Sequence, residues 1–472
     1  MLLIYFISAL FLAISTYLFK NKHITNYTFV AFLIINCLFN VHTFLNINKT
    51  ELLYFTFDSI GILMQSVLSI LGISTFYFSK VYLEEEKSER RKRIYYTALT
   101  ILIVAMNGVY LANDATVLWI LIEATTLSVA MLIYHERTSL ALEATWKYVF
   151  ICSTGIALAY MGILFLSALL QTSNHELDLS FLNLTKSLIN ANPVFLKIAF
   201  IFIFIGYSTK MGLFPMHTVT IDAHTIAPPP ISALISTALM NVGFIGIFRI
   251  YNVLSATPIA YWMNNILIIS GILSILTSTA YLFKVNHVKR MLAYSSLENM
   301  GIVAIGLGIG GIGYYAAILH IVLHSFAKAG LFYNVLTIHK LYDSYDMNNI
   351  KNYISKNKSH AYLFILLIIM LSAIPPSGLF ISKIFILQSL IIKAQYMYFI
   401  IIVTLLCFLL YNLLSKTLKI ALPDKTSTDS KVILDMGFII QLVFIAIIIY
   451  LGIIRPPILD NLINQAIIYL PI

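Results

Sequence analysis

The sequence contains few charged residues and very few cysteines. Only 11% of its 472 residues are Asp, Glu, Lys or Arg, whereas 60% are hydrophobic, and the mean hydropathy is +0.89. A water-soluble domain cannot bury that much apolar surface, so the composition predicts a polytopic membrane protein. The apolar runs are long and do not alternate with polar residues, which favours helices over a β-barrel. The expected fold class is therefore all-α.

The three cysteines, Cys37, Cys152 and Cys407, lie far apart inside apolar runs. This spacing indicates neither a disulfide framework nor an iron–sulfur site. The sequence also has no P-loop, no CxxC motif and no GxGxxG placed after a strand. We therefore expect no cofactor or metal on this chain and no nucleic-acid partner.

Apolar runs long enough to cross a bilayer predict about fourteen transmembrane helices. Residues 2–19 are interpreted as the first of these and not as a signal peptide, because no small-residue cleavage site follows them. The boundary between two helices is least distinct at residues 310–313, where they meet with almost no loop.

Two of the predicted spans are interrupted by proline. Residues 194–220 are broken near Pro215, and residues 361–394 are broken near Pro375. Each broken span is the fourth helix in a run of five. Because five is an odd number of crossings, the second run enters the membrane from the side opposite to the first. This predicts an inverted repeat whose paired broken helices mark a transport site. The expected divisions are N-terminal helices 1–3 in 1–93, the first repeat in 94–253, the second repeat in 254–416, and the last helix and tail in 417–472.

Lysine and arginine gather in alternate loops, for example in the run 84–93 (EEEKSERRKR) and around Lys289 and Lys425. Loops rich in lysine and arginine remain in the cytoplasm. Both termini fall on the face opposite these loops, so both should face outward. The run 84–93 is interpreted as a solvated loop that fixes this topology or contacts a partner. The expected location is the cytoplasmic membrane of a bacterium or archaeon, and the lipid bilayer is an expected partner.

Lys210 lies five residues before Pro215 in an otherwise apolar span. A lysine at membrane depth costs at least ~2.5–3.5 kcal/mol, so its default interpretation is functional. The alternative is a lysine whose charged end reaches the membrane surface. Because apolar residues flank it on both sides, we favour a buried lysine beside the interrupted helix.

Other ionisable residues also fall at membrane depth. Glu123 is the single charge of its span, and a carboxylate there can stay ionised if it faces Lys210. His320, His324 and Lys328 follow one another in steps of four, which places them on one helical face. Lys383 comes directly after the second break. One carboxylate, three lysines and two histidines suit a proton that moves between titratable groups.

Several polar residues lie near these positions. Glu143 and Lys147 are four residues apart at a helix start and predict a local ion pair, and Asp222 and His224 occupy the loop after the first break. The pattern HxxxH (320–324) also occurs in metal sites, but no third ligand lies nearby in the sequence. Haem ligation by these histidines requires a facing partner on another helix.

The residues of this sequence from about 95 to 390 resemble the antiporter-like subunits shared by complex I (NADH–quinone oxidoreductase), Mrp antiporters and membrane-bound hydrogenases. They look most like the F subunit of hydrogenase-4 and formate hydrogenlyase-type complexes, a branch that Trp146 and Glu298 favour. The matching phrases are IEATTLS (122–128), LEATWKY (142–148), GLFPMH (212–217), DAH (222–224), VKRMLAYSSLENMG (288–301) and HSFAKAGLF (324–332).

The resemblance implies a role for each matching residue. Glu123 would pair with Lys210 in a first half-channel. Lys328, with His320 and His324, would occupy the centre of a second half-channel, and Lys383 would take its terminal position. Water-filled half-channels would join these groups. The supporting polar residues of the resemblance are Glu143, Lys147, His217, Asp222, His224, Asn241 and Glu298.

The sequence departs from the family pattern at three places. Asn241 stands where complex I relatives often have a second lysine, and Lys383 stands where the hydrogenase branch has glutamate. The stretch HTVTIDAH (217–224) lacks the tryptophan and proline that relatives usually carry before DAH. These departures bear on the branch of the family and on the charge of the terminal site.

The resemblance also implies partners. Other membrane and peripheral subunits of a respiratory hydrogenase or complex-I-like assembly would carry iron–sulfur clusters and a nickel–iron centre or quinone, and this chain would be a non-redox subunit that binds none of them. We expect it to translocate protons. The alternatives are a cation/proton antiporter subunit of the Mrp type and a membrane anchor that does not pump.

Overall fold

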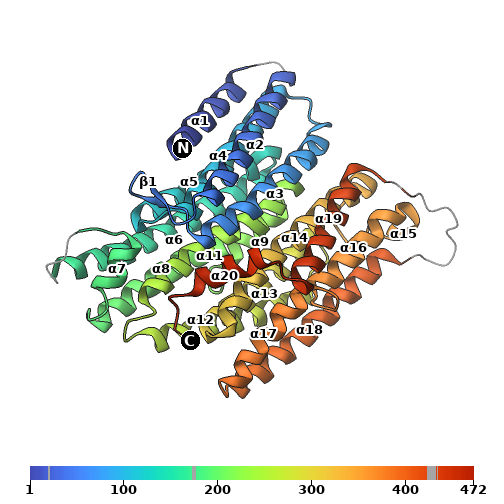
Figure 1. Ribbon diagram of the computed structural model, residues 1–472. Helices are drawn as coiled ribbons and strands as arrows, with labels where there is room; N and C mark the ends of the chain where they lie inside the picture. Colours follow the sequence, from blue (N-terminus) through green and yellow to red (C-terminus); the bar gives the residue numbers. More distant parts are fainter. Residues whose placement is uncertain (20–21, 173–176, 423–431, 433, 472) are drawn as a thin grey trace. The chain divides into compact units, whose positions relative to one another are not determined.

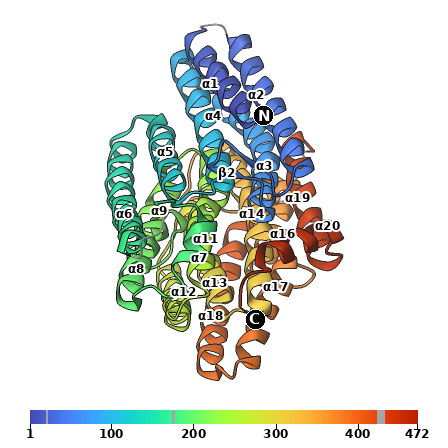
Figure 2. The same ribbon diagram turned by 60° about the vertical axis from the view of Figure 1, so that its left-hand side comes forward.

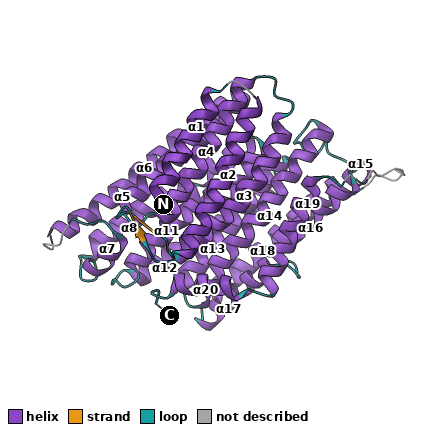
Figure 3. Cartoon of the chain, turned by 45° about the horizontal axis from the view of Figure 1, so that its top comes forward, coloured by secondary structure: helices purple, strands orange, loops and turns teal. Residues whose placement is uncertain are grey.

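The computed structural model describes residues 1–19, 22–172, 177–422, 432 and 434–471. These residues form helices almost throughout, with one small two-stranded hairpin (Figure 3). Among the described residues, 12 helices are long and apolar enough to cross a membrane. The all-α polytopic membrane fold expected from the composition is therefore confirmed. Lys425, which we placed in a cytoplasmic loop, lies outside the described residues.

The chain divides into two compact units. Unit 1 comprises Met1–Pro228, Ala238–Met263 and Leu462–Pro471, and unit 2 comprises Pro229–Thr237 and Asn264–Asn461. The helices and strands of unit 1 are α1 (Leu2–Leu18), α2 (Lys22–Leu45), β1 (Thr50–Glu51), β2 (Phe55–Thr56), α3 (Ser59–Leu83), α4 (Glu89–Leu111), α5 (Ala115–Ile133), the 3-10 turn η1 (Tyr134–Glu136), α6 (Ser139–Thr172), α7 (Phe181–Ser187), α8 (Pro193–Met211), α9 (His217–Ile226) and α11 (Met240–Leu254).

Unit 2 contains α10 (Pro229–Leu234), α13 (Val288–Ile309), α14 (Ile312–Tyr342), α15 (Tyr353–Lys356), α16 (Lys358–Leu371), α17 (Gly378–Ile392), α18 (Tyr396–Ala421) and α19 (Met436–Ile453). The division passes through three further elements: the π-helical turn η2 (Ile235–Leu239), α12 (Ala260–Leu282) and α20 (Pro457–Ile467). The short elements α7, α15, α20 and the hairpin had no counterpart among the predicted spans.

Both predicted helix breaks are present. Helix α8 ends at Met211 because Gly212 adopts a left-handed conformation with φ of 74°, and Pro215 prevents the helix from continuing before α9 begins. In unit 2, α16 ends at Leu371, prolines follow, and the Ser377 side chain caps the first turn of α17. The division expected at residues 310–313 is also confirmed, since α13 ends at Ile309 and α14 begins at Ile312.

Polar side chains set where several helices of unit 1 begin. Asp58 caps α3 by accepting from Gly61 N, and Asp114 caps α5 by accepting from two backbone N–H groups. The Asp58 carboxylate also accepts from both terminal nitrogens of Arg249, at 2.8 and 3.1 Å. Arg249 is a buried residue of α11, and these contacts join this helix to the start of α3.

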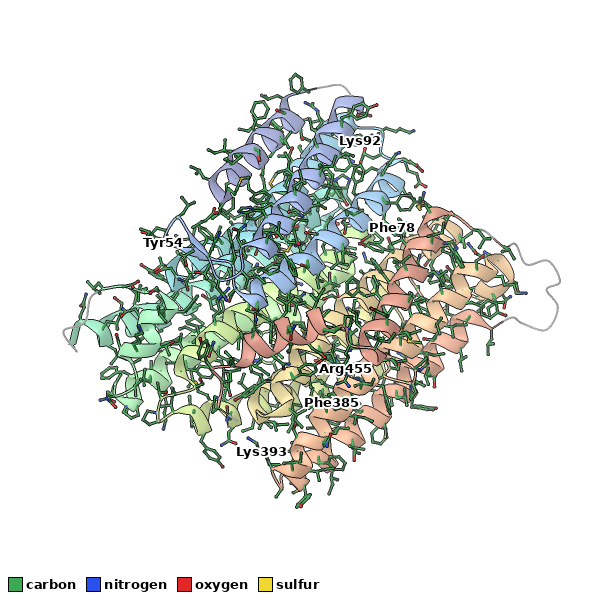
Figure 4. All side chains as sticks on the ribbon, in the orientation of Figure 1. Tyr54, Phe78, Lys92, Phe385, Lys393 and Arg455 are labelled. Atoms are coloured by element: carbon green, nitrogen blue, oxygen red, sulfur yellow. The ribbon has the colours of Figure 1, made fainter. Side chains whose placement is uncertain are left out.

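The packing of helices within each unit determines which of its polar residues lie close together. In unit 1, α6 packs along α8 and also against α5 (Figures 1 and 2). In unit 2, α13, α14 and α17 pack against one another. The Arg455 guanidinium lies 5.7 Å from the centre of the Phe385 ring, so the segment before α20 contacts α17 at this residue (Figure 4).

Candidate functional site

In unit 1, Lys210 occupies the last turn of α8, directly before the helix break. Its side chain is 1% exposed, so it lies inside the protein, and the alternative of a lysine that reaches the membrane surface is wrong. The ammonium donates to the hydroxyl of Tyr148 on α6 at 2.9 Å and lies 4.9 Å from the centre of that ring. A neutral hydroxyl and an aromatic face therefore contact this buried lysine.

The close approach of α6 and α8 brings Tyr148 to Lys210. A Cβ added at Gly206 would lie 2.5 Å from the carbonyl oxygen of Gly155, and one added at Gly162 would lie 2.7 Å from the carbonyl oxygen of Ala199. Side chains do not fit at these distances, so only glycine allows the two backbones to approach so closely. The small residues of both helices thus set the geometry around the lysine.

Glu123 lies half-buried on α5. Its carboxylate accepts from Ser153 Oγ on α6 at 2.8 Å and from Thr126 Oγ1 at 3.1 Å. In the described part of the chain it forms no ion pair with Lys210, although the resemblance implied that these two residues pair. Helix α6 supplies a partner to each of them, so the carboxylate and the ammonium are held separately in this structure.

The segment after the first break folds back on α8. Thr220 Oγ1 donates to the carbonyl oxygen of Thr209 at 3.3 Å, and the ring of His217 stacks on Phe214. The ring nitrogen Nδ1 of His224 contacts the carbonyl oxygen of Thr220 within its own helix. The Thr220–Thr209 hydrogen bond joins α9 to the end of α8.

The other supporting residues of unit 1 differ in exposure. Asp222 is half-buried and Asn241 is fully buried in α11. Glu143 and Lys147 form the expected ion pair, with 2.5 Å between Oε1 and Nζ, but their side chains are 58% and 52% exposed. This pair lies on the outer side of α6 and does not contact Lys210.

In unit 2, His320, His324 and Lys328 are all 0% exposed, as expected for one buried face of α14. The Lys328 ammonium donates to the carbonyl oxygen of Leu292 at 2.6 Å and to the hydroxyl of Ser295, both on α13. A carbonyl and a hydroxyl are again neutral partners. Lys328 therefore resembles Lys210 in donating to neutral groups.

Lys383 forms an ion pair with Glu298, with 2.7 Å between Nζ and Oε1. The two side chains are 9% and 1% exposed. The second carboxylate oxygen of Glu298 accepts from Asn299 Nδ2 at 2.6 Å, and Asn299 Oδ1 contacts His320 Nε2 at 3.0 Å. One hydrogen-bonded network therefore connects α13, α14 and α17.

The sequence pattern did not indicate five residues that the structure places beside these charges: Tyr148, Ser153, Ser295, Asn299 and Ser382. Ser295 and Asn299 are four residues apart, and this spacing places them on one helical face with the same period as the α14 series. The four-residue spacing of Ser295 and Asn299 can therefore be recognised in the sequence as one helical face. Tyr148 and Ser382 carry no such signal, because their partners are 62 residues away in the sequence.

Metal and haem ligation were alternatives for the HxxxH pattern. Both ring nitrogens of His320 contact protein side chains, Ser382 and Asn299. Within the residues that the structure describes, no group of three or more His, Cys, Asp and Glu side chains is placed to hold a metal ion. His320 is therefore part of the hydrogen-bonded network.

The fold and the buried charges define a class: a polytopic helical membrane protein in which interrupted helices carry ionisable side chains inside the protein. The sequence pattern of the family described as NADH:quinone oxidoreductase/Mrp antiporter, TM, matches residues 112–409. The chain belongs to this family. It is 32% identical over 344 residues to a hydrogenase-4 component F homolog of Methylacidiphilum infernorum, covering 71% of this chain and 72% of that protein.

Relatives of lower sequence identity include a second hydrogenase-4 component and chains of two solved complexes. Hydrogenase-4 component B of Escherichia coli is 26% identical over 347 residues, and the match spans 71% of this chain but 50% of that protein. Among solved structures, a chain of an archaeal membrane-bound sulfane sulfur reductase has a TM-score of 0.87 at 18% identity, covering 98% of this chain and 95% of that chain. A chain of the Mrp complex from Dietzia sp. has a TM-score of 0.85 at 15% identity, covering 99% and 96%. These structures share the fold.

Proposed function

We propose that this chain translocates protons across the membrane as the antiporter-like subunit of a membrane-bound hydrogenase or NADH-quinone-oxidoreductase-like complex. The observation that carries the proposal is the burial of three lysines, Lys210, Lys328 and Lys383, at 1%, 0% and 8% exposure, beside hydroxyl groups, histidine and carboxylates. Buried ionisable groups of this kind are expensive in a membrane and mark proton relays.

Each unit supplies one half-channel. In unit 1 the relay residues are Glu123 and Lys210, and Tyr148 contacts the lysine. In unit 2 they are Lys328, His320, His324 and Lys383. Glu298 belongs to the second half because its carboxylate holds the Lys383 ammonium.

The inverted repeat is part of the proposal. The first repeat occupies 94–253 and the second 254–416, and each contains one of the two helix breaks. The 12 long apolar helices, together with the shorter apolar helices α1, α16 and α17, support about fourteen crossings if α16 and α17 act as one broken span. An even number of crossings places both termini on the outer side when the basic loops face the cytoplasm.

The partners follow from the relatives. We infer that redox chemistry takes place on other subunits, which carry iron–sulfur clusters and a nickel–iron centre or quinone. This chain acts as the non-redox subunit. The supporting fact is the 32% identity to a hydrogenase-4 component F homolog.

An Mrp-type cation/proton antiporter subunit is the second candidate, because the fold matches a chain of the Mrp complex with a TM-score of 0.85. A Na⁺ site requires several oxygen ligands, whereas lysines repel a cation. One measurement distinguishes the two candidate functions. Sealed vesicles that contain the complex should acidify independently of Na⁺ and K⁺ in the first case, and only with a counter-cation in the second.

The decisive test measures proton translocation and redox turnover in the same vesicles. In the intact complex, Lys210→Ala and Glu123→Gln should lower the rate of dye-detected acidification by roughly 100-fold. Lys186→Ala is the matched control, because it removes an exposed lysine of α7 that has no place in the proposed relay. If both relay variants pump as fast as the control while turnover continues, the chain is a non-pumping anchor.

A further inference from the structure

Asn299 joins three polar residues of unit 2 and has no assigned role. Its side chain is 0% exposed on α13. Its amide nitrogen Nδ2 donates to the carbonyl oxygen of Ser295 at 2.6 Å and to Oε2 of Glu298 at 2.6 Å. Its amide oxygen Oδ1 faces Nε2 of His320 at 3.0 Å. Every polar atom of this amide therefore has a partner.

The two partners of Nδ2 fix the orientation of the amide. A backbone carbonyl oxygen and an ion-paired carboxylate accept hydrogen bonds and cannot donate them. Rotating the Asn299 amide by 180° would place its oxygen against both of these acceptors. The hydrogen-bond network thus identifies the atom that faces His320 as the amide oxygen.

The amide oxygen in turn fixes the tautomer of His320. Because Oδ1 can only accept, Nε2 of His320 must carry a hydrogen atom. In the neutral ring the other nitrogen, Nδ1, then has a lone pair, and it faces Ser382 Oγ on α17 at 2.8 Å. Nδ1 is the position at which this ring gains or loses a proton.

Ser382 has one hydroxyl hydrogen and two possible acceptors. It lies 3.0 Å from the carbonyl oxygen of Leu379 and 2.8 Å from Nδ1 of His320. When the ring is neutral, the hydroxyl donates to Nδ1. When the ring is protonated, Nδ1–H donates to the serine oxygen and the hydroxyl turns to the carbonyl oxygen of Leu379.

We propose that Asn299 is a positioning residue that holds His320 in the Nε2–H tautomer, so that protons enter and leave the ring at Nδ1, on the side of Ser382. Uptake of one proton makes the ring an imidazolium, and its release restores the neutral ring. The titratable groups to consider around this step are Glu298 and Lys383 on the neighbouring helices, and His324 and Lys328 further along α14. The tautomer follows from the geometry, whereas its use in transport rests on the proposed function.

The tautomer can be read from ¹⁵N solid-state NMR of the full chain in lipid, with ring-labelled histidine. The chain has 11 histidines, so the spectrum of a His320→Asn variant is subtracted to isolate one ring. At a pH at which the ring is neutral, we expect one protonated nitrogen assigned to Nε2 and one unprotonated nitrogen assigned to Nδ1. A ring protonated at Nδ1 alone would overturn the assignment.

Two variants identify the residue that sets the tautomer. Asn299→Leu should shift the tautomer equilibrium by roughly five- to a hundredfold, because it removes the acceptor of Nε2–H. Ser382→Ala should leave the Nε2–H tautomer in place. If Ser382→Ala changes the tautomer and Asn299→Leu does not, the serine sets it and the proposal is wrong.

Asn334→Leu is the matched control for the loss of a buried amide. Asn334 lies on α14, is 0% exposed, and donates to the carbonyl oxygen of His360 and to Gln441, outside the Asn299 network. This variant should leave the His320 signal unchanged. A change of the tautomer equal to that in Asn299→Leu would show that general loosening of the helices moves the signal, which would overturn the specific role of Asn299.

Transport is measured separately in the intact complex. Asn299→Leu should slow proton translocation, and Asn299→Gln, which keeps an amide, should restore part of the rate. If Asn299→Leu changes the tautomer but pumps at the wild-type rate, the use of Nδ1 in transport is refuted. Failure of the proposed function itself shows differently, as unaltered pumping in Lys210→Ala and Glu123→Gln.

Discussion

Replacing Lys383 with methionine should strongly destabilise the protein, because it leaves the Glu298 carboxylate buried without its cation. Methionine keeps much of the length of the lysine stem and removes only the charge. The Glu298 side chain is 1% exposed and cannot turn to water. Its remaining donor is Asn299 Nδ2, at 2.6 Å.

The magnitude follows from the geometry. At the observed 2.7 Å, two unit charges attract by about 6 kcal/mol at an effective dielectric constant of ~20. Removing both charges from water offsets much of this attraction. Removal of one partner of a buried pair costs about 3–5 kcal/mol, whereas replacement of both by apolar or neutral groups is close to neutral. We therefore expect Lys383→Met to lower the free energy of unfolding by about 3 kcal/mol or more, and Lys383→Met with Glu298→Gln to recover most of that loss.

A double-mutant cycle measures this coupling. The free energy of unfolding is obtained by titrating the purified chain, held in mixed lipid–detergent micelles, with SDS. The titration is carried out for the wild type, both single variants and the double variant. The exposed pair Glu143–Lys147 serves as control, and its cycle should give a coupling within experimental error, because solvent screens it. A loss below about 1 kcal/mol for Lys383→Met, or equal losses in the single and double variants, would refute the reasoning.

Two further predictions concern packing and pH. Gly206→Ala should destabilise the protein by about 1–3 kcal/mol and weaken pumping, since its Cβ would lie 2.5 Å from a carbonyl oxygen of α6. Gly72→Ala, whose nearest atoms lie at 3.6 Å, should be tolerated in the same thermal unfolding assay, and equal losses would contradict the packing argument. Burial, with the nearby charges of Lys289 and Arg290, lowers the pKa of His287 to about 4. Because the unfolded chain binds that proton from pH ~6.5 downward, stability should fall by about 1–3 kcal/mol as pH drops from ~6.5 to ~4. His287→Asn should remove this part of the pH dependence, as read from unfolding midpoints, and an unchanged slope would contradict it.

The sequence predicted the helix breaks and the buried face of α14 because both depend on local chemistry. Pro215 and Pro375 lack a backbone N–H and their rings clash with the preceding turn, so they favour a kink or a break in the helix. His320 and Lys328 lie on one face because the helical period places them there. Lys210 was predicted to be buried because its neighbours in the sequence are apolar on both sides, and the structure agrees.

The partners of these residues could not be predicted, because they depend on which helices pack together. Glu298 and Lys383 are 85 residues apart, and no periodicity links them. The hairpin also lacked a signal, since Leu52 and Leu53 adopt positive φ without glycine. The π-helical turn at Ile235–Leu239 depends on tertiary contacts as well, because Tyr110 donates to the carbonyl oxygen of Ala238 at 2.7 Å.

The two units, each considered by itself, hold their carboxylate and lysine in opposite arrangements. In unit 1, Glu123 accepts from hydroxyl groups while Lys210 donates to Tyr148. In unit 2, Lys383 and Glu298 are in contact at 2.7 Å. A carboxylate in contact stabilises the charge of an ammonium more than a hydroxyl does. A lysine that exchanges one kind of partner for the other therefore changes how firmly it holds its proton. This property is what the proposed proton relay needs at each step, and Tyr148 is the neutral partner that Lys210 has in unit 1.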